Sequence, residues 1–160
     1  MAEMEKNLQS PEQMLKTIQI IRGALLAGPF GFMGIVLFLA SFPLKFQTDI
    51  LFFVAIFLTI QCLVLAFAAD RLFAKKPKNW NQQSDADHQN SLASITLQIK
   101  LIQGALLEGP TFFWLVLLLT NNNAFGLFFA LILMAIAAFL FPTKNRFFGL
   151  IDKLYERFRA

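Results

Sequence analysis

Apolar residues in this chain form four long runs, separated by shorter polar or charged segments. The runs extend over residues 18–42, 49–73, 101–120 and 124–141. A helix needs about 20 apolar residues to cross a hydrocarbon core about 30 Å thick. Each run is close to that length, so the pattern predicts an all-α integral membrane protein with four transmembrane helices.

Residues at the ends of the runs indicate where the helices begin and end. Ser10 followed by Pro11 is typical of an N-cap and first turn, so we expect the first helix to start outside the membrane. We expect the third helix to start near Ser91, which can also act as an N-cap. Pro142 should end or kink the fourth helix, because proline lacks the N–H that the helix needs.

The segment after Pro142 has its own pattern. Within residues 143–160, apolar side chains recur at helical spacing on one face and basic side chains lie largely elsewhere. This pattern predicts a C-terminal amphipathic helix. We expect its apolar face either to lie flat on the cytoplasmic leaflet or to dock on a partner subunit.

Composition and charge add the orientation. Hydrophobic residues make up 57% of the 160-residue chain and charged residues 15%, against roughly 25% charge in soluble domains, which excludes an ordinary soluble protein. Of 14 Lys and Arg residues, Lys45 alone lies between the first two runs, and the turn at residues 121–123 has none. The positive-inside rule therefore predicts an inner (cytoplasmic) membrane protein with both termini and the middle loop in the cytoplasm. The net charge of +4 follows from this asymmetry and does not indicate nucleic-acid binding.

The chain contains an internal repeat. Residues 22–32 read RGALLAGPFGF and residues 103–113 read QGALLEGPTFF. The second and fourth runs share LFF, and DRLF at residues 70–73 is echoed by NRFF at residues 145–148, just after the fourth run. The repeat unit is thus a two-helix hairpin, over residues 11–73 and again over 91–141. Two spans per copy give both copies one orientation, so we expect a parallel repeat about a pseudo-two-fold axis along the membrane normal, within one membrane domain over 1–160.

Each copy carries a proline inside an apolar helix, Pro29 in the first and Pro110 in the second. Each leaves the carbonyl four residues earlier without its helical partner, at Leu25 and Leu106. We expect a kink at both prolines, and in lipid the freed carbonyl needs a neighbouring helix, a water or a cation. Alternatively, the kinks only shape how the helices pack.

Small residues follow one stripe of the first helix. Gly23, Ala27 and Gly31 lie four residues apart, a spacing that lets another helix approach closely. Gly104 lies on the equivalent stripe of the third helix, where Glu108 replaces Ala27. The repeat has therefore placed a carboxylate at one position of a predicted helix-packing groove.

Glu108 is the one acidic residue well inside an apolar run, about 10 Å from the end of that run near Lys100. A charge there costs about 2.5 to 3.5 kcal/mol, so we expect it to face protein or water. Gln61 lies at a similar depth and is the expected partner, with the Leu106 carbonyl as a further ligand. Two interpretations stay open: Glu108 binds or passes a proton or a cation such as sodium, or it makes a hydrogen bond that joins helices.

Other reactive side chains are few. Cys62 is the only cysteine, which excludes an internal disulfide and a cysteine-based metal site. His88 is the only histidine, and we expect it to be solvated in the polar middle loop. The runs contain no nucleophile–base pair and no metal-ligand cluster, so the sequence predicts a non-enzymatic protein without a cofactor or metal.

The GALLEGPTFFWLVLLL segment, within a chain of two hairpins, resembles a set of uncharacterised small bacterial four-span membrane proteins with an Ala-Leu-x-Glu-Gly motif in the third span. The likeness covers most of the chain and implies no activity. More distantly, the chain is similar to the duplicated proteolipid subunits of rotary ATPases. That resemblance implies a homo-oligomer with Glu108 as the proton or sodium carrier. The competing hypothesis is a structural or accessory subunit, whose groove and C-terminal helix hold a larger membrane complex.

Overall fold

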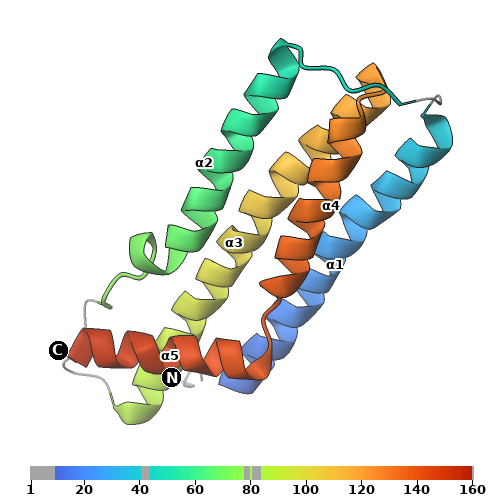
Figure 1. Ribbon diagram of the computed structural model, residues 1–160. Helices are drawn as coiled ribbons and strands as arrows, with labels where there is room; N and C mark the ends of the chain where they lie inside the picture. Colours follow the sequence, from blue (N-terminus) through green and yellow to red (C-terminus); the bar gives the residue numbers. More distant parts are fainter. Residues whose placement is uncertain (1–9, 41–43, 78–79, 81–83, 160) are drawn as a thin grey trace, which may run out of the picture.

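The computed structural model describes residues 10–40, 44–77, 80 and 84–159, and these form helices joined by short connections. Figure 1 shows four of the helices side by side in a bundle, with the fifth lying across one end. The helices are α1 (Pro11–Leu39), α2 (Ile50–Leu72), α3 (Asp85–Asn121), α4 (Ala124–Phe139) and α5 (Lys144–Arg159). The predicted all-α class is confirmed for the described residues.

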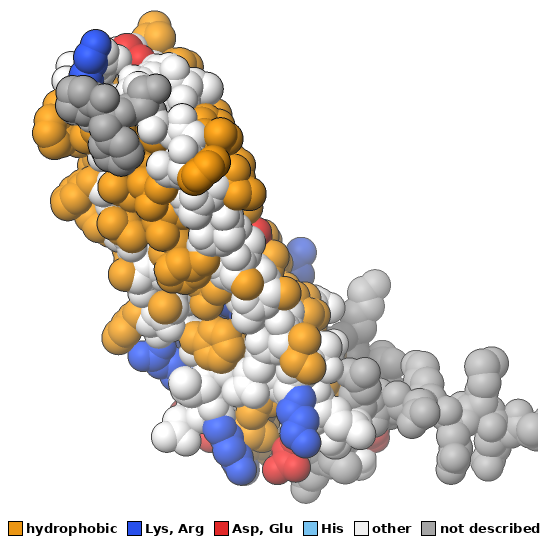
Figure 2. All heavy atoms as spheres, turned by 90° about the vertical axis from the view of Figure 1, so that its right-hand side faces the viewer, with side chains coloured by type: hydrophobic (Ala, Val, Ile, Leu, Met, Phe, Trp, Pro, Cys, Tyr) orange, Lys and Arg blue, Asp and Glu red, His pale blue; other side chains and the backbone are white. Residues whose placement is uncertain are grey.

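Three helices, α1, α2 and α3, are each long and apolar enough to cross a membrane. The 16 residues of α4 reach about 24 Å, and α4 qualifies as a span only together with α5, from which it is bent by 69°. In Figure 2, hydrophobic side chains cover most of the length of one face, and Lys and Arg gather towards the end that carries α5. The described part of the chain thus has three helices long and apolar enough to cross a membrane, or up to four if α4 and α5 form one bent span.

Helix α3 is the centre of the bundle. Each of α1, α2 and α4 packs against α3, whereas α1 and α2 barely touch each other in the described part of the chain. Residues 11–73 therefore do not pack as the hairpin that the repeat predicts, while α3 and α4 do pack together. The connections explain this difference, because a two-residue turn forces α3 and α4 together and residues 40–49 are long enough to carry the chain past α3.

Two helix starts were predicted from capping residues, with different outcomes. The Ser10 hydroxyl accepts from the Gln13 N–H at 3.3 Å and the Ser10 N–H donates to Gln13 Oε1 at 2.9 Å, so the predicted cap is confirmed as a capping box. The start near Ser91 is wrong, because α3 already begins at Asp85 with Ser84 as its N-cap. Acidic residues directly after Ser84 favour an early start, since they suit the positive end of the helix dipole.

The C-terminal segment is a helix, as predicted, but its apolar face is covered by the chain itself. Five side chains of α5 are buried, and they belong to one cluster with residues of α1 and α3: Phe147, Leu150, Ile151, Leu154 and Phe158. Neither lipid nor a partner subunit is needed to cover this face. Helix α5 therefore closes one end of the bundle (Figure 1).

His88 lies in α3 rather than in a solvated loop, which corrects the expectation. Its ring stacks on Trp80 with the centroids 4.1 Å apart, and its Nε2 lies 2.7 Å from the Trp80 carbonyl oxygen. Trp80 in turn is buried against Phe158 of α5. These aromatic contacts thus pack Trp80, which lies between α2 and α3, against α3 and α5.

The opposite end is held by hydrogen bonds between the two connections. The Lys45 N–H donates to the Asn122 carbonyl and the Ala124 N–H donates to the Lys45 carbonyl, both at 2.9 Å. The Asn121 side-chain amide donates to the Asp49 carboxylate at 2.7 Å. Asn122 adopts the left-handed conformation with φ 49°, which asparagine tolerates better than most residues. We call this set of bonds the loop strap.

Candidate functional site

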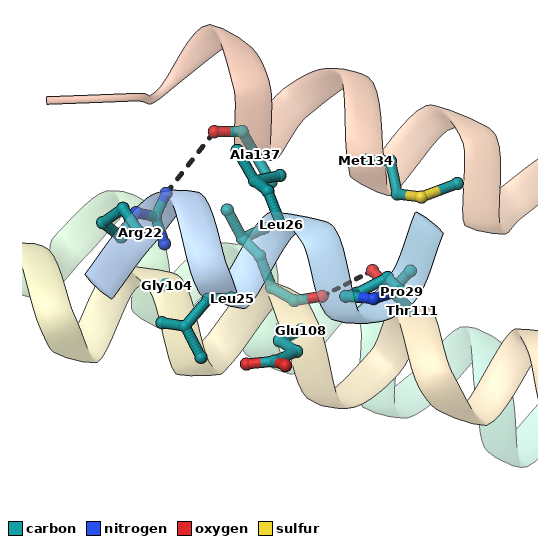
Figure 3. Close-up of a pocket in the computed structure, with 10 residues that line it drawn as sticks. Arg22, Leu25, Leu26, Pro29, Gly104, Glu108, Thr111, Met134 and Ala137 are labelled. Carbon is teal, nitrogen blue, oxygen red and sulfur yellow. Dashed lines mark hydrogen bonds between the residues drawn. The ribbon is translucent and has the colours of Figure 1, made fainter. Parts of the chain in front are cut away.

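A buried arginine of α1 reaches both α3 and α4. Arg22 of α1 is 2% exposed. Its Nη2 donates to the Ala137 carbonyl of α4 at 3.4 Å, and its side chain crosses Gly104 of α3 so closely that a Cβ there would overlap Nη1 (Figure 3). The position needs glycine on α3, because any larger residue would displace the guanidinium.

Beside Arg22 lies a narrow pocket between α1, α3 and α4, with a volume of about 10 Å³. That is about enough for one water molecule. Apolar side chains form most of its wall, and its polar members are Arg22, Glu108 and Thr111 (Figure 3). The Thr111 hydroxyl donates to the Leu107 carbonyl of its own helix at 2.7 Å, so it is engaged locally.

Glu108 of α3 is half-buried and faces α1. A Cβ placed on Gly28 would lie 3.6 Å from Glu108 Oε1, so the carboxylate rests against a bare stretch of the α1 backbone. Figure 3 shows Glu108 on the side of the α1–α3 contact away from α4. It attracts Arg22 electrostatically, although the two groups are not in direct salt-bridge contact.

The repeat relates the polar groups of the two copies. Arg22 corresponds to Gln103, whose side-chain amide donates to the Ala66 carbonyl of α2 at 3.0 Å. Both side chains therefore reach a main-chain carbonyl on a helix of the other copy. Glu108 corresponds to Ala27, which is exposed. The first copy of the repeat thus contributes the positive charge of Arg22, and the second contributes the carboxylate of Glu108.

The structure does not bring Gln61 or Leu106 to the pocket. Gln61 is exposed on α2, and Leu106 packs into the hydrophobic cluster of the bundle. Helix α2 meets a different face of α3, where the buried Trp114 Nε1–H donates to the Thr59 hydroxyl at 2.9 Å. Glu108 faces α1 at Gly28, so Gln61 is not its partner, and the charge that acts on it electrostatically is that of Arg22.

The predicted packing groove is used in one place only within the described chain. Gly104 makes the tight contact with Arg22, whereas a Cβ on Gly23 or Gly31 would meet nothing within 4 Å. The stripe of Gly23, Ala27 and Gly31 therefore faces outward. The close approach of α1 to Glu108 is at Gly28, which the spacing argument missed.

The two prolines do not interrupt their helices. Both α1 and α3 continue through Pro29 and Pro110, and both rings are buried. Pro29 lines the pocket beside Arg22, so its ring forms part of the pocket wall. Among the residues that the structure describes, no three His, Cys, Asp or Glu side chains are grouped as a metal site would require.

The arrangement defines what the site can do chemically. A carboxylate can take up and release a proton, whereas a guanidinium stays charged at any physiological pH. Arg22 therefore lowers the electrostatic cost of an ionised Glu108 and opposes a second cation. In the sequence, Arg22 could be recognised only as a single basic residue inside an apolar run. Gln103 occupies the corresponding position in the second copy of the repeat.

Comparisons with family models, with curated proteins and with solved structures each gave no match to this chain.

Proposed function

We propose that this chain is a non-enzymatic, proteolipid-like subunit with four membrane spans that binds or passes a proton at Glu108, with Arg22 as the counter-charge. One observation carries the proposal: Glu108 is half-buried in the apolar part of α3, beside a water-sized pocket that also holds a buried arginine. Carboxylates at such depth are costly and mark proton and ion pathways.

The surroundings favour a proton over sodium. A sodium ion needs several oxygen ligands, and the two co-ligands expected from the sequence, Gln61 and the Leu106 carbonyl, belong to residues that do not line the pocket. The fixed charge of Arg22 also repels a metal cation but stabilises the carboxylate after a proton leaves.

The outer surface supports assembly with a second copy or a partner complex in the inner membrane. The stripe of Gly23, Ala27 and Gly31 is free within the chain, and small residues on an open helix face let another helix approach. The basic end of the bundle is the end that the positive-inside rule assigns to the cytoplasm.

A second candidate function is a structural or accessory membrane subunit. The observation that favours it is that Arg22 of α1 contacts both α3 and α4, so Arg22 and Glu108 would serve to hold α1 on α3. Here Glu108 stays ionised and never exchanges its proton during function.

Labelling with a hydrophobic carbodiimide tests the proposal, because the reagent modifies protonated carboxyl groups in apolar surroundings. In proteoliposomes we expect one label, at Glu108, detected by mass spectrometry of the intact protein and its peptides. Arg22→Gln should extend labelling to higher pH, since the neighbouring positive charge that favours the ionised form is gone.

The controls are Glu108→Gln, which should abolish the label, and Glu156→Gln on the exposed face of α5, which should not change it. Folded wild-type protein that resists the reagent over about pH 5 to 9 would contradict proton binding. So would an unchanged pH profile in Arg22→Gln. The structural alternative predicts instead that Glu108→Gln and Arg22→Gln both lower the melting temperature, with no labelling of the wild type.

A further inference from the structure

A second pocket lies at the closed end of the bundle, between α2, α3 and α5. Its volume is about 310 Å³, much larger than the pocket beside Glu108. Its charged members are Lys100 of α3, Arg146 and Lys153 of α5, and Asp70 of α2. Three cations thus share this pocket with one carboxylate.

The single carboxylate is already occupied. Lys153 Nζ lies 3.0 Å from Asp70 Oδ2 in a direct ion pair. Lys100 Nζ donates to the neutral Gln103 Oε1 at 2.9 Å, and the Arg146 guanidinium lies 4.5 Å from the centre of the Phe139 ring. Lys100 and Arg146 repel each other, so an anion between them would relieve an existing repulsion.

The pocket continues into a groove along α2 that has charged residues at one end and apolar residues at the other. A neighbouring hollow of about 490 Å³ shares Phe67, Asp70 and Lys153 with the pocket and extends past Leu63 and Val64. Val64 and Phe67 are each 61% exposed. A ligand that fits both parts carries a negative charge at one end and a hydrocarbon chain at the other.

The position along the bundle matches such a ligand. Lys100 precedes the third apolar run and Asp70 follows the uncharged part of the second, so the cations lie where the apolar surface ends. In a bilayer, that level is occupied by headgroup phosphates.

We propose that this pocket binds the phosphate of an anionic phospholipid, with Lys100 and Arg146 as the principal contacts and an acyl chain along Val64 and Phe67. Guanidinium and ammonium groups are the usual partners of phosphate. Free phosphate offers the same charge but leaves the groove on α2 empty, which is why we assign the site to a lipid.

Native mass spectrometry of the full chain, released from mild detergent after incubation with dioleoyl phosphatidylglycerol or dioleoyl phosphatidylcholine, tests the proposal. We expect the protein to retain phosphatidylglycerol, the anionic lipid, in preference to phosphatidylcholine. The double variant Lys100→Gln, Arg146→Gln should weaken its retention by about twenty-five-fold, because each basic residue near a lipid phosphate contributes a factor of about five. The matched control Lys75→Gln, Lys76→Gln removes the same charge outside the pocket and should keep the preference.

A steric variant makes the test independent of charge. A Cβ on Gly149, which lines the pocket, would meet nothing within 4 Å, so the helix accepts a larger residue there. Gly149→Phe should block lipid retention, whereas Gly149→Ala should leave it intact.

Four results would overturn the proposal. The first is equal retention of both lipids by the wild type, and the second is unchanged retention in Gly149→Phe. The third is displacement of the lipid by excess inorganic phosphate, which would indicate a free-anion site. The fourth is equal loss of the lipid in the Lys75, Lys76 control, which would indicate unspecific charge attraction.

Discussion

At the scale of single residues, the polar groups inside the bundle differ in how well they are satisfied. Arg22 reaches a carbonyl on α4, yet its Nε finds no acceptor among the described residues. Trp114 has a hydroxyl partner in Thr59. Thr96 is fully buried in α3, and its hydroxyl has no partner in the described part of the chain. A buried polar group without a partner lowers stability, so these positions respond differently to substitution.

Thr96→Val should stabilise the protein by about 1 kcal/mol, because valine keeps the branched shape and removes a buried hydroxyl that bonds nothing. Thr59→Val is the matched contrast and should destabilise, since it leaves the buried Trp114 N–H without an acceptor. Thermal unfolding in detergent measures both. A lower melting temperature for Thr96→Val would show that its hydroxyl is satisfied after all.

The sequence drew attention to Glu108, which the structure places beside the pocket, but the partner predicted for it, Gln61, does not line that pocket. Glu108 stands out because it is an acid within an apolar run, which needs no knowledge of packing. Gln61 was chosen by depth alone, and depth does not say which face of α3 meets which helix. Arg22 was visible as a cation near the start of a run, but its burial depends on Gly104 and Ala137, which are distant in sequence.

At the scale of helices, the bundle depends on how closely its neighbours approach α3. Gly126 of α4 is a point of close approach between α3 and α4, because a Cβ there would lie 2.5 Å from the Trp114 carbonyl oxygen and 2.8 Å from the Leu118 nitrogen. Both of these are backbone atoms, which cannot rotate away. The two helices would have to move apart.

Gly126→Ala should therefore destabilise the protein by about 1 to 3 kcal/mol, the usual cost of overpacking. Gly34→Ala in α1 is the control: a Cβ there meets nothing within 4 Å, and alanine is the better helix former, so stability should hold or rise. Both melting temperatures can be measured in one detergent. Equal effects of the two substitutions would contradict the close contact.

Helix ends were more predictable than helix partners. Ser10 and Pro142 mark their ends through local chemistry, a side-chain cap and a missing N–H, and the structure agrees with both. The start of α3 was missed because a polar stretch that continues a helix beyond the apolar run resembles a loop. The repeat predicted two equal hairpins, but the lengths of the connections decided which helices became neighbours.

At the scale of the whole molecule, the two ends of the bundle are closed in different ways. At the basic end, α5 covers α1 and α3 with its apolar face. At the other end, the loop strap joins the two connections by main-chain hydrogen bonds. The proposed four-span topology places the basic end in the cytoplasm and the loop strap outside it.

Cysteine labelling tests that orientation in a Cys62→Ser background. Gln47, beside the loop strap, and Asn145, in α5, are both exposed. With a membrane-impermeant maleimide on intact cells, Gln47→Cys should react and Asn145→Cys should react only after lysis. The reverse pattern would invert the topology, and labelling of both sites from outside would contradict a spanning bundle.

The central place of α3 has a consequence for how the protein is made. Helices α1 and α2 leave the ribosome first, and since they barely touch each other, they have almost no surface on which to fold together. In the proposed membrane topology, the nascent chain should therefore hold two separate helices in the bilayer until α3 emerges to join them. Synthesis of the third helix is then the commitment step of biogenesis, and chains truncated before it should be preferred substrates for membrane proteases.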